Sequence, residues 1–459
     1  MADRDGKEKT TGPVLTVAGQ CHLSGISTSF LAALQNKLTI DNPKYHAAKK
    51  YGRWVGKNFQ QKLFLYTLDD AGIIFPRGFA AQAVALCKTY MGRGPKIQDK
   101  RRRLPEVDFS FQGVLRPYQK EAVADILRKH FGVLVAGTGS GKTIMALEVI
   151  AQRRQPSLIL VHSRELMYQW EERVRQFLGI QAGLIGDSKY DIQPLSIAIV
   201  NTARKKLEEL IPSFGHLIVD ECHRVPASLF TEVVKTFDAY YMLGLSATAY
   251  RREDGLTPLI YLYMGERSHQ VDPKKLAESG AVLKPEFIQR TTGFNYVFRG
   301  NYQTLMNSLT KNEARNQQIA DDINREAGET AGTILVVSDR VAHCQKLAEL
   351  LACKGVQASV LTGKQSAIER SAIVGSLHRG EIKVLISTLQ LVGEGFDAAG
   401  LTTLFLTTPI KFTGRLRQVI GRILRPAAGK QPKVIDYVDE QVGVLKNSAR
   451  IRRQAYEQE

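Results

Sequence analysis

Short apolar runs alternate with longer amphipathic stretches along most of this 459-residue chain. In the first half the apolar runs predict five strands, at 133–136, 157–161, 196–200, 216–219 and 242–245. In the second half they predict four more, at 333–337, 359–361, 384–386 and 403–406. Strands that alternate with helical stretches form βαβ units, so the pattern predicts two α/β domains, each with a parallel sheet. Runs that are apolar at every position are typical of strands buried on both faces.

The segment before this pattern is organised differently. Residues 61–66 alternate as a strand does, and residues 79–87 favour a helix, which together predict a compact α+β module. We expect residues 280–330 to be mostly helical, with a polar helix at 312–316. The predicted parts are a flexible tail (1–11), a basic accessory domain with its charged linker (12–104), and two α/β domains (105–279 and 280–459).

A glycine-rich segment follows the strand predicted at 133–136 and precedes a helical run that starts at Ile144. Its residues are Gly137, Thr138, Gly139, Ser140, Gly141, Lys142 and Thr143. In a strand–turn–helix of this kind the backbone N–H groups converge and the helix dipole favours negative charge, which suits a phosphate group. We expect Lys142 to contact the β- and γ-phosphates and Thr143 to bind Mg²⁺. The strict pattern has glycine where this chain has Ala136. The segment predicts a nucleoside triphosphate site.

An acidic pair, Asp220 and Glu221, comes directly after the strand predicted at 216–219. A carboxylate at such a strand end can hold the Mg²⁺ of a nucleotide, and its neighbour can polarise the attacking water. We assign Asp220 to the metal and Glu221 to the water. An acidic pair on its own is more often a solvated loop, but its position downstream of a phosphate loop favours catalysis.

Near the other end of the chain, Gln418, Arg422 and Arg425 stand at helical spacings of four and three residues. One helix face then presents an amide and two guanidinium groups, as an arginine finger does when it stabilises the charge of a transferring phosphate. The alternative is a basic surface helix. Together with the two motifs above, the spacing favours the arginine finger.

These motifs, taken in order from about Leu115 to about Asp439, resemble those of superfamily 2 helicases of the DExH kind. Leu115-Arg116-Pro117-Tyr118-Gln119 resembles the adenine-reading motif, which implies roles for Arg116 and Gln119. Ser246-Ala247-Thr248 resembles the motif that couples hydrolysis to domain movement, and Gly395 and Asp397 lie in a loop that approaches the nucleotide in this superfamily. The resemblance implies two tandem RecA-like domains with one ATP and Mg²⁺ between them.

Within the superfamily, the chain is most similar to the XPB and UvsW type of DNA translocase, because Arg252-Glu253-Asp254 resembles the short RED element of XPB. Ala249 stands where relatives usually carry proline. The resemblance implies that His223 links the water-activating carboxylate to the second domain. The alternative is that His223 is an ordinary hydrogen-bonded histidine at a strand end. By resemblance, the nucleic-acid contacts are Arg164, Thr202, Arg204, Arg252, Ser338, Arg340, Thr362, Gly363 and Thr388. Such side chains suit phosphates and read no base sequence, although Ser and Thr also serve as ordinary helix caps.

The net charge of +18 indicates a polyanionic partner. Residues 1–104 hold 18 Lys and Arg against 7 Asp and Glu, so +11 of this charge lies in the accessory domain and its linker. Aromatic residues lie among these basic ones, and we expect phosphate contact from the charge and packing in the core from the aromatics. The five scattered cysteines, without a C-x-x-C pair, argue against a disulfide framework and structural zinc; Cys222 is expected to be a buried packing residue. The absence of a long apolar run and of an apolar signal core predicts an intracellular, cytoplasmic protein, with a phage or other mobile element as a conceivable source.

The sequence thus predicts an ATP-dependent DNA helicase or translocase that acts on duplex, forked or branched DNA, with ATP and Mg²⁺ as cofactors. Three alternatives stay open: an RNA-stimulated ATPase, the motor subunit of a larger restriction or defence complex, and a scaffold that uses ATP only as a switch. We expect a monomer, and a partner subunit is compatible with the sequence.

Overall fold

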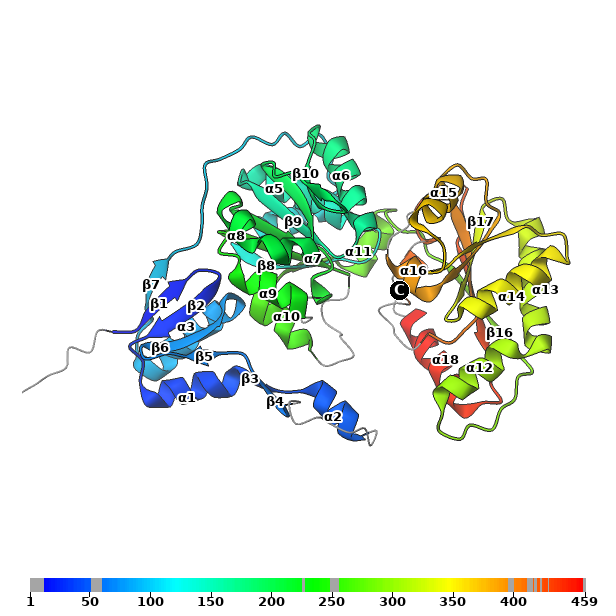
Figure 1. The fold of residues 1–459 in the computed structure, drawn as a ribbon, viewed down its shortest axis with the longest axis horizontal. Coiled ribbons are helices and arrows are strands. Elements are labelled where there is room, and N and C mark those ends of the chain that lie inside the picture. The colour runs from blue at the N-terminus through cyan, green and yellow to red at the C-terminus, as the bar shows by residue number, and fades with distance from the viewer. Residues whose placement is uncertain are drawn as a thin grey trace, which may run out of the picture. The chain divides into compact units, whose positions relative to one another are not determined.

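The computed structural model describes residues 12–456 except 51–59, 225–227, 248–255, 395–399, 411–415, 417–418, 422 and 428 (Figure 1). The chain folds as two compact units, one of residues 1–136 with 142–270 and the other of residues 137–141 with 271–459. Among the described residues, no helix combines the length and the apolar character needed to cross a membrane.

The N-terminal module, residues 14–99, is built on a five-stranded sheet of order β5-β6-β2-β1-β7. Its strands are β1 (Val14–Val17), β2 (Gln20–Ser24), β5 (Thr67–Leu68), β6 (Gly72–Pro76) and β7 (Lys96–Asp99). All neighbours are antiparallel except β1 and β7. Helices α1 (Thr28–Lys37) and α3 (Ala80–Met91) cover one face, because Leu15, Leu23 and Phe75 of alternate strand positions pack against them. A short pair, β3 (Thr39–Asp41) and β4 (Lys62–Phe64), and helix α2 (Pro43–Lys50) complete the module.

This arrangement agrees with the α+β prediction, although the strand expected at 61–66 is shorter and the helix expected at 79–87 is longer. The expectation that the aromatic residues of this module pack in the core is wrong for Phe64 and Tyr90. Phe30 is fully buried, whereas Phe64 is 55% and Tyr90 47% exposed. Tyr51, Trp54 and Phe59 lie outside the described residues.

The module is joined to the first α/β domain by buried contacts within the same unit. Arg77, only 1% exposed, donates from Nη1 to the carbonyl oxygen of Ala239 at 2.8 Å and contacts Met242 Sδ at 2.9 Å. Gly78 lies so close to the next backbone that an added Cβ would be 2.3 Å from the oxygen of Tyr261. Arg102 in the linker pairs with Asp238 at 3.0 Å. Part of the charged linker therefore contacts the first α/β domain.

The first α/β domain has an eight-stranded sheet of order β11-β10-β12-β9-β13-β14-β8-β15, parallel except for β11. Its strands are β8 (Phe131–Val135), β9 (Ser157–Val161), β10 (Gly183–Gly186), β11 (Lys189–Tyr190), β12 (Leu195–Ile199), β13 (His216–Val219), β14 (Tyr241–Ser246) and β15 (Arg267–Gln270). Its helices are α4 (Pro117–Leu127), α5 (Lys142–Arg153), α6 (Arg164–Leu178), α7 (Val200–Ala203), α8 (Leu207–Leu210), α9 (Ser228–Thr236) and α10 (Thr257–Met264). All five predicted strands are present within two residues. Strands β10, β11 and β15, at or next to the sheet edges, were not predicted, since they are short and carry glycine or polar residues.

The second α/β domain has a fully parallel six-stranded sheet of order β16-β21-β20-β17-β19-β18. Its strands are β16 (Glu286–Thr291), β17 (Thr333–Ser338), β18 (Ala358–Leu361), β19 (Val384–Thr388), β20 (Leu401–Leu406) and β21 (Lys433–Val438). Its helices are α12 (Tyr302–Lys311), α13 (Glu313–Glu329), α14 (Val341–Ala352), α15 (Ala367–His378), α16 (Leu389–Glu394) and α18 (Gly443–Tyr456), with α11 (Pro273–Glu278) before them. Helices α13 and α14 pack on one face, while α15 and α16 pack on the other.

Two expectations for residues 280–330 are corrected. Residues 286–291 form β16, a strand in the second sheet, rather than part of a helical bridge. The strand is only half-buried at the sheet edge, so its apolar signal is weak. The helix expected to be polar at 312–316 is the start of α13, with Asn312 as its N-cap, and Arg315 and Asn316 are buried.

Arg315 forms a buried ion pair that ties α13 to the end of β21. Its Nε lies 2.8 Å from Asp439 Oδ1, its Nη1 donates to the Thr407 carbonyl oxygen at 2.9 Å, and Thr292 Oγ1 also donates to Asp439. Both charged side chains are 1% exposed. A buried pair with its hydrogen bonds made is tolerated, but removing one partner leaves the other charge unpaired.

Asp439→Ala is therefore expected to destabilise the protein by about 3–5 kcal/mol. The melting temperature should fall by roughly 6–20 °C, measured by circular dichroism or scanning calorimetry. The control is Arg290→Ala. Arg290 forms an ion pair with Asp322, and its side chain is 42% exposed. A partly exposed pair is worth about 1 kcal/mol or less. Equal melting temperatures for the two variants would contradict the prediction.

Candidate functional site

The glycine-rich segment connects β8 to α5, as the sequence predicted. Gly139 and Gly141 have φ of +83° and +79°, values that favour glycine because a Cβ would be strained there. The Ser140 N–H donates to the Gly137 carbonyl oxygen at 3.2 Å, so the loop folds into a tight turn. Lys142 begins α5 and donates from Nζ to the Ala136 carbonyl oxygen at 3.0 Å. A glycine-rich turn that leads into the first residue of a helix is a local structure that suits an anion.

Asp220 directly follows β13 and is 8% exposed. It accepts a hydrogen bond from Trp170 Nε1 of α6 at 2.9 Å and another from the Glu221 N–H at 2.9 Å. Burial and, next, the charge of Glu221 raise the pKa of Asp220 to about 6, although Trp170 and the Lys142 charge oppose the shift. A cation at this carboxylate would favour its ionised form. The Asp220 carboxylate and the Thr143 hydroxyl are oxygen donors of the kind that Mg²⁺ prefers, so the residues present fit this ion.

Glu221 has a φ of +48°, in the left-handed region that non-glycine residues seldom occupy. Such conformations cluster at functional sites, where the surrounding structure holds them. His223 Nδ1 lies 3.1 Å from Glu221 Oε2 and 3.2 Å from Ser246 Oγ. Burial raises the pKa of Glu221, but the neighbouring His223 and the Lys142 charge outweigh it and lower the pKa overall. Glu221 is therefore ionised and able to orient a water molecule.

The end of β14 closes this cluster, because the Ser246 carbonyl oxygen accepts the Ala136 N–H at 3.0 Å. The structure thus brings together Lys142, Asp220, Glu221, His223 and Ser246, which the sequence had only placed in order along the chain. Cys222, in the middle of the acidic motif, is fully buried and packs in the core, as expected.

His162 lies near the acidic pair. It follows β9, and neither ring nitrogen has a hydrogen-bond partner among the described residues. Burial, followed by the charge of Arg224, lowers the pKa of His162 to about 4, while the Glu221 charge acts in the opposite direction. The imidazole is therefore neutral near pH 7 and lies within electrostatic reach of Glu221. No spacing in the sequence distinguishes it from the other histidines.

The candidate adenine-reading residues lie at the start of α4. Gln119 is 5% exposed, and its Oε1 accepts the Arg116 N–H at 2.9 Å, which closes the first turn of the helix. Several other predicted residues, namely Thr248, Arg252, Gly395, Asp397, Gln418 and Arg422, lie outside the described residues.

Arg425 is described, and it lies in a bend just beyond the helical residues that end at 423. The predicted helix face therefore does not extend to Arg425. Pro426 follows directly, and a residue before proline is disfavoured in the helical conformation. Lys430 Nζ donates to the Arg425 carbonyl oxygen at 2.8 Å.

In the first α/β domain, the predicted nucleic-acid contacts lie in loops and helix starts after strands β9 and β12. Ser163 is the N-cap of α6, as the alternative reading allowed, and Arg164 Nη1 lies 3.4 Å from Asp187 Oδ1. Tyr168 donates its hydroxyl to Asp187 Oδ2 at 2.8 Å. Thr202 is on α7, and Arg204 pairs with Glu232 at 3.2 Å.

In the second α/β domain, the predicted contacts lie after β17, β18 and β19. Ser338 is fully buried, Arg340 is half-buried with its guanidinium donating to Gln303 Oε1, and Thr388 ends β19. Thr362 is 2% exposed and Gly363 is exposed. The structure therefore buries Ser338, the last residue of β17, and Thr362, in the loop after β18, while Gly363 next to Thr362 is exposed.

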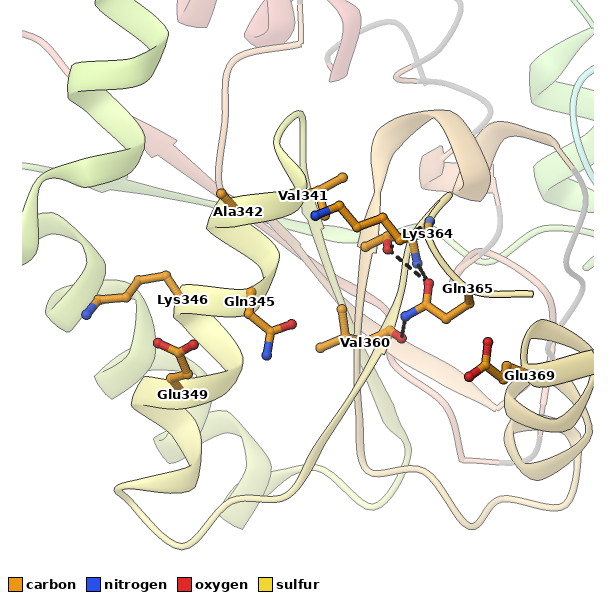
Figure 2. A pocket seen from close by; sticks show the side chains of 10 residues that line it. Val341, Ala342, Gln345, Lys346, Glu349, Val360, Lys364, Gln365 and Glu369 are labelled. Atoms are coloured by element: carbon orange, nitrogen blue, oxygen red, sulfur yellow. Dashed lines mark hydrogen bonds between the residues drawn. The ribbon is translucent and has the colours of Figure 1, made fainter. Parts of the chain in front are cut away.

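A hollow of about 590 Å³ lies beside the loop that contains Thr362 (Figure 2). Val341, Ala342, Gln345, Lys346 and Glu349 of α14 line one wall, and Val360, Thr362, Lys364, Gln365 and Glu369 line the other. Gln365 shapes the loop, since its Oε1 accepts from Thr362 N at 2.6 Å and from Thr362 Oγ1 at 2.9 Å. Its Nε2 donates to the Val360 carbonyl oxygen at 2.9 Å.

Comparisons with known proteins match both α/β domains. Residues 112–251 match the family described as type III restriction enzyme, res subunit, and residues 314–427 match the helicase conserved C-terminal domain. A helicase named L396 from Acanthamoeba polyphaga mimivirus, whose name assigns it to RNA, is 28% identical over 379 residues, 77% of this chain and 70% of that protein. The DNA 3'-5' translocase XPB2 of Sulfurisphaera tokodaii is 26% identical over 347 residues, 68% of this chain and 78% of that protein. The structure of S. cerevisiae Dbp5 bound to RNA and ADP BeF3 superposes with a TM-score of 0.55 at 16% identity, over 74% of this chain and 87% of that one, which shows the fold.

Proposed function

Because this chain belongs to the superfamily 2 helicases and is an ATP-hydrolysing enzyme that acts with nucleic acid, we propose that it couples ATP hydrolysis to movement along duplex, forked or branched DNA. The observation that carries the proposal is the cluster of Lys142, Asp220, Glu221, His223 and Ser246 at the strand ends of the first α/β domain. The glycine-rich segment and the acidic pair support ATP hydrolysis, and the similarity to a protein named as a DNA translocase supports movement along DNA.

In this proposal the phosphate loop and Lys142 bind the β- and γ-phosphates, while Thr143 and Asp220 hold Mg²⁺. The bound ion supplies charge neutralisation at the phosphates. Glu221 accepts the hydrogen bond of the attacking water and orients it, and His223 relays the state of Glu221 to Ser246. Gln418, Arg422 and Arg425 of the second domain stabilise the charge that develops on the γ-phosphate.

Phosphate contacts would come from the surface loops at strand ends in both domains. Arg164, Thr202 and Arg204 serve in the first domain, and Arg340, Gly363 and Thr388 in the second, where the buried Ser338 and Thr362 would hold the contacting turns in place. Lys346 and Lys364 line the hollow beside the Thr362 loop, together with Glu349 and Glu369. Contacts of this kind grip the backbone without reading sequence. The exposed basic residues of the N-terminal module would add further contacts to the phosphate backbone.

RNA is the second candidate, favoured by the similarity to L396. Phosphate-directed contacts do not separate DNA from RNA; a contact to the 2′-hydroxyl does. The deciding experiment is steady-state ATP hydrolysis with single-stranded, duplex and forked DNA and with matched RNA at one salt concentration. Strongest stimulation by duplex or forked DNA supports the proposal. Stimulation by RNA alone would replace it, and no stimulation by either nucleic acid would refute it.

Asp187 competes with phosphate for Arg164 in this proposal. Asp187→Asn removes a carboxylate that pairs with Arg164 at 3.4 Å, while an amide oxygen can still accept from Tyr168. We expect the affinity for duplex DNA to rise about two- to fivefold at low salt, because an exposed pair is weak. Fluorescence anisotropy measures it. Asp191→Asn is the control, since Asp191 is exposed and accepts a side-chain hydrogen bond from Gln193 at 3.0 Å. Equal affinity of the two variants would refute the competition.

A further inference from the structure

A chain of buried side chains runs from α12 and α13 to the turn that carries Arg340. Asn316 Nδ2 donates to the Thr310 carbonyl oxygen at 2.9 Å. Asn316 Oδ1 lies 2.9 Å from His343 Nε2, and His343 Nδ1 lies 2.9 Å from Ser338 Oγ. Ser338 Oγ in turn accepts the Arg340 N–H at 3.2 Å. Asn316, His343 and Ser338 are all at most 2% exposed.

The Thr310 carbonyl fixes the direction of every proton in this chain. A carbonyl only accepts, so Asn316 must present its amide nitrogen to Thr310 and its oxygen to His343. His343 Nε2 therefore carries the proton and donates it, which leaves Nδ1 as an acceptor for the Ser338 hydroxyl. Because the hydroxyl hydrogen then points to His343, the free lone pairs of Ser338 Oγ accept the Arg340 N–H. Asn316, His343 and Ser338 each donate one hydrogen bond and accept another, and the four bonds support one another.

The imidazole stays neutral in this setting. Burial and, to a smaller extent, the Arg315 charge lower the pKa of His343 to about 3. A doubly protonated ring would donate from both nitrogens and reverse the Ser338 hydroxyl. The chain therefore keeps its direction over the whole range of pH at which the protein would work.

The two faces of α14 have different surroundings. His343 and Cys344 face the core, whereas Ala342, Gln345 and Lys346 line the hollow shown in Figure 2. The turn between β17 and α14 is also held by the Asp339 N–H, which donates to Thr408 Oγ1 at 2.9 Å. The backbone of Arg340 is thereby fixed directly before the first residue of α14.

We infer that His343, held by Asn316, is a positioning residue that sets the Arg340 turn for contact with the nucleic-acid backbone. The inference rests on the proposed function, in which Arg340 contacts a phosphate. The side chain of His343 is enclosed and touches no substrate. It acts through Ser338, by keeping the Arg340 N–H and the start of α14 in one place before nucleic acid arrives, so that binding does not have to order them.

The test measures, for forked DNA, the concentration that gives half-maximal ATPase stimulation and the maximal rate at saturating DNA. Arg340→Ala and His343→Leu should each raise the half-maximal concentration about five- to tenfold, the effect of losing roughly one hydrogen bond, with the maximal rate within about twofold. His343→Gln keeps one donor for Asn316 and one acceptor for Ser338. It should restore the half-maximal concentration to that of the unaltered protein.

Leu347→Met is the matched control, since Leu347 is one turn further along α14, fully buried, and its side chain forms no hydrogen bond. His343→Leu behaving like Leu347→Met, or His343→Gln failing to rescue, would overturn the inference while DNA stimulation of the unaltered protein still upholds the proposed function. An unchanged half-maximal concentration in Arg340→Ala would overturn it as well. No stimulation of the unaltered protein by DNA would refute the proposed function and the inference together. Hydrogen exchange at the Arg340 amide, faster in His343→Leu than in His343→Gln, confirms that the chain itself was broken.

Discussion

Replacing Asp220 by asparagine is expected to reduce DNA-stimulated ATP hydrolysis by about 10³-fold, since a bound metal ion contributes several kcal/mol of charge stabilisation to the transition state. The asparagine side chain would not be a charged ligand for Mg²⁺, but its oxygen can still accept from Trp170 Nε1, which lies 2.9 Å from the Asp220 carboxylate in the unaltered protein. The substitution therefore changes charge and leaves shape almost unaltered. Initial rates at saturating DNA and ATP measure the effect, with Lys142→Ala as the blank.

Asp238→Asn is the control for this variant, because Asp238 is an aspartate of the same domain that pairs with Arg102 at 3.0 Å, away from the acidic motif. Its rate should stay within about twofold, because this half-buried ion pair lies outside the acidic motif. The melting temperature of Asp220→Asn must match that of the unaltered protein for the comparison to hold. A folded Asp220→Asn protein that retains a third or more of the stimulated rate would remove Asp220 from the metal-binding role.

The affinity for duplex DNA is expected to fall by about 10³-fold between roughly 50 mM and roughly 200 mM salt, as for a protein that makes about six phosphate contacts. The net charge is +18, and +11 of it comes from residues 1–104. In the N-terminal module the exposed basic residues include Lys37, Lys62, Lys88, Arg93 and Lys96. Each phosphate contact releases counterions, so the logarithm of the binding constant should fall linearly with the logarithm of the salt concentration.

The matched variant for this prediction replaces Lys88, Arg93 and Lys96 by glutamine. If the module contacts DNA, the slope of that line should decrease by up to about three. A duplex of scrambled sequence should bind equally well, because phosphate contacts carry no base information. An unchanged slope in the triple variant would place the DNA contacts elsewhere on the chain.

Much of the architecture could be predicted because its signals are local. The strands at 157–161 and 216–219 are apolar at nearly every position, and both are buried in the parallel sheet at those residues. The phosphate loop could be predicted for the same reason: Gly139 and Gly141 supply positive φ angles that few other residues tolerate. Edge strands such as β15 and β16 could not be predicted, since a strand with one paired edge and a half-exposed face carries little apolar pattern.

The candidate site shows the same division. The residue types and their order along the chain were sufficient to select Lys142, Asp220, Glu221 and His223, because phosphate and metal chemistry requires those groups after strand ends. Whether these side chains meet could not be read from spacing. The bond from Trp170 to Asp220 and the contact of His223 with Ser246 join residues that are 50 and 23 positions apart. Neither is encoded in a local pattern.

The sequence by itself determined the two parallel α/β sheets, the phosphate loop and the acidic pair, since periodicity, glycine geometry and charge act over a few residues. Only the tertiary structure decided which polar groups are buried and paired. It placed Arg77 at the junction of the N-terminal module, Arg315 against Asp439, and His343 between Asn316 and Ser338. A polar residue buried by distant strands and helices looks the same in sequence as one on the surface, because burial depends on the packing of the whole domain.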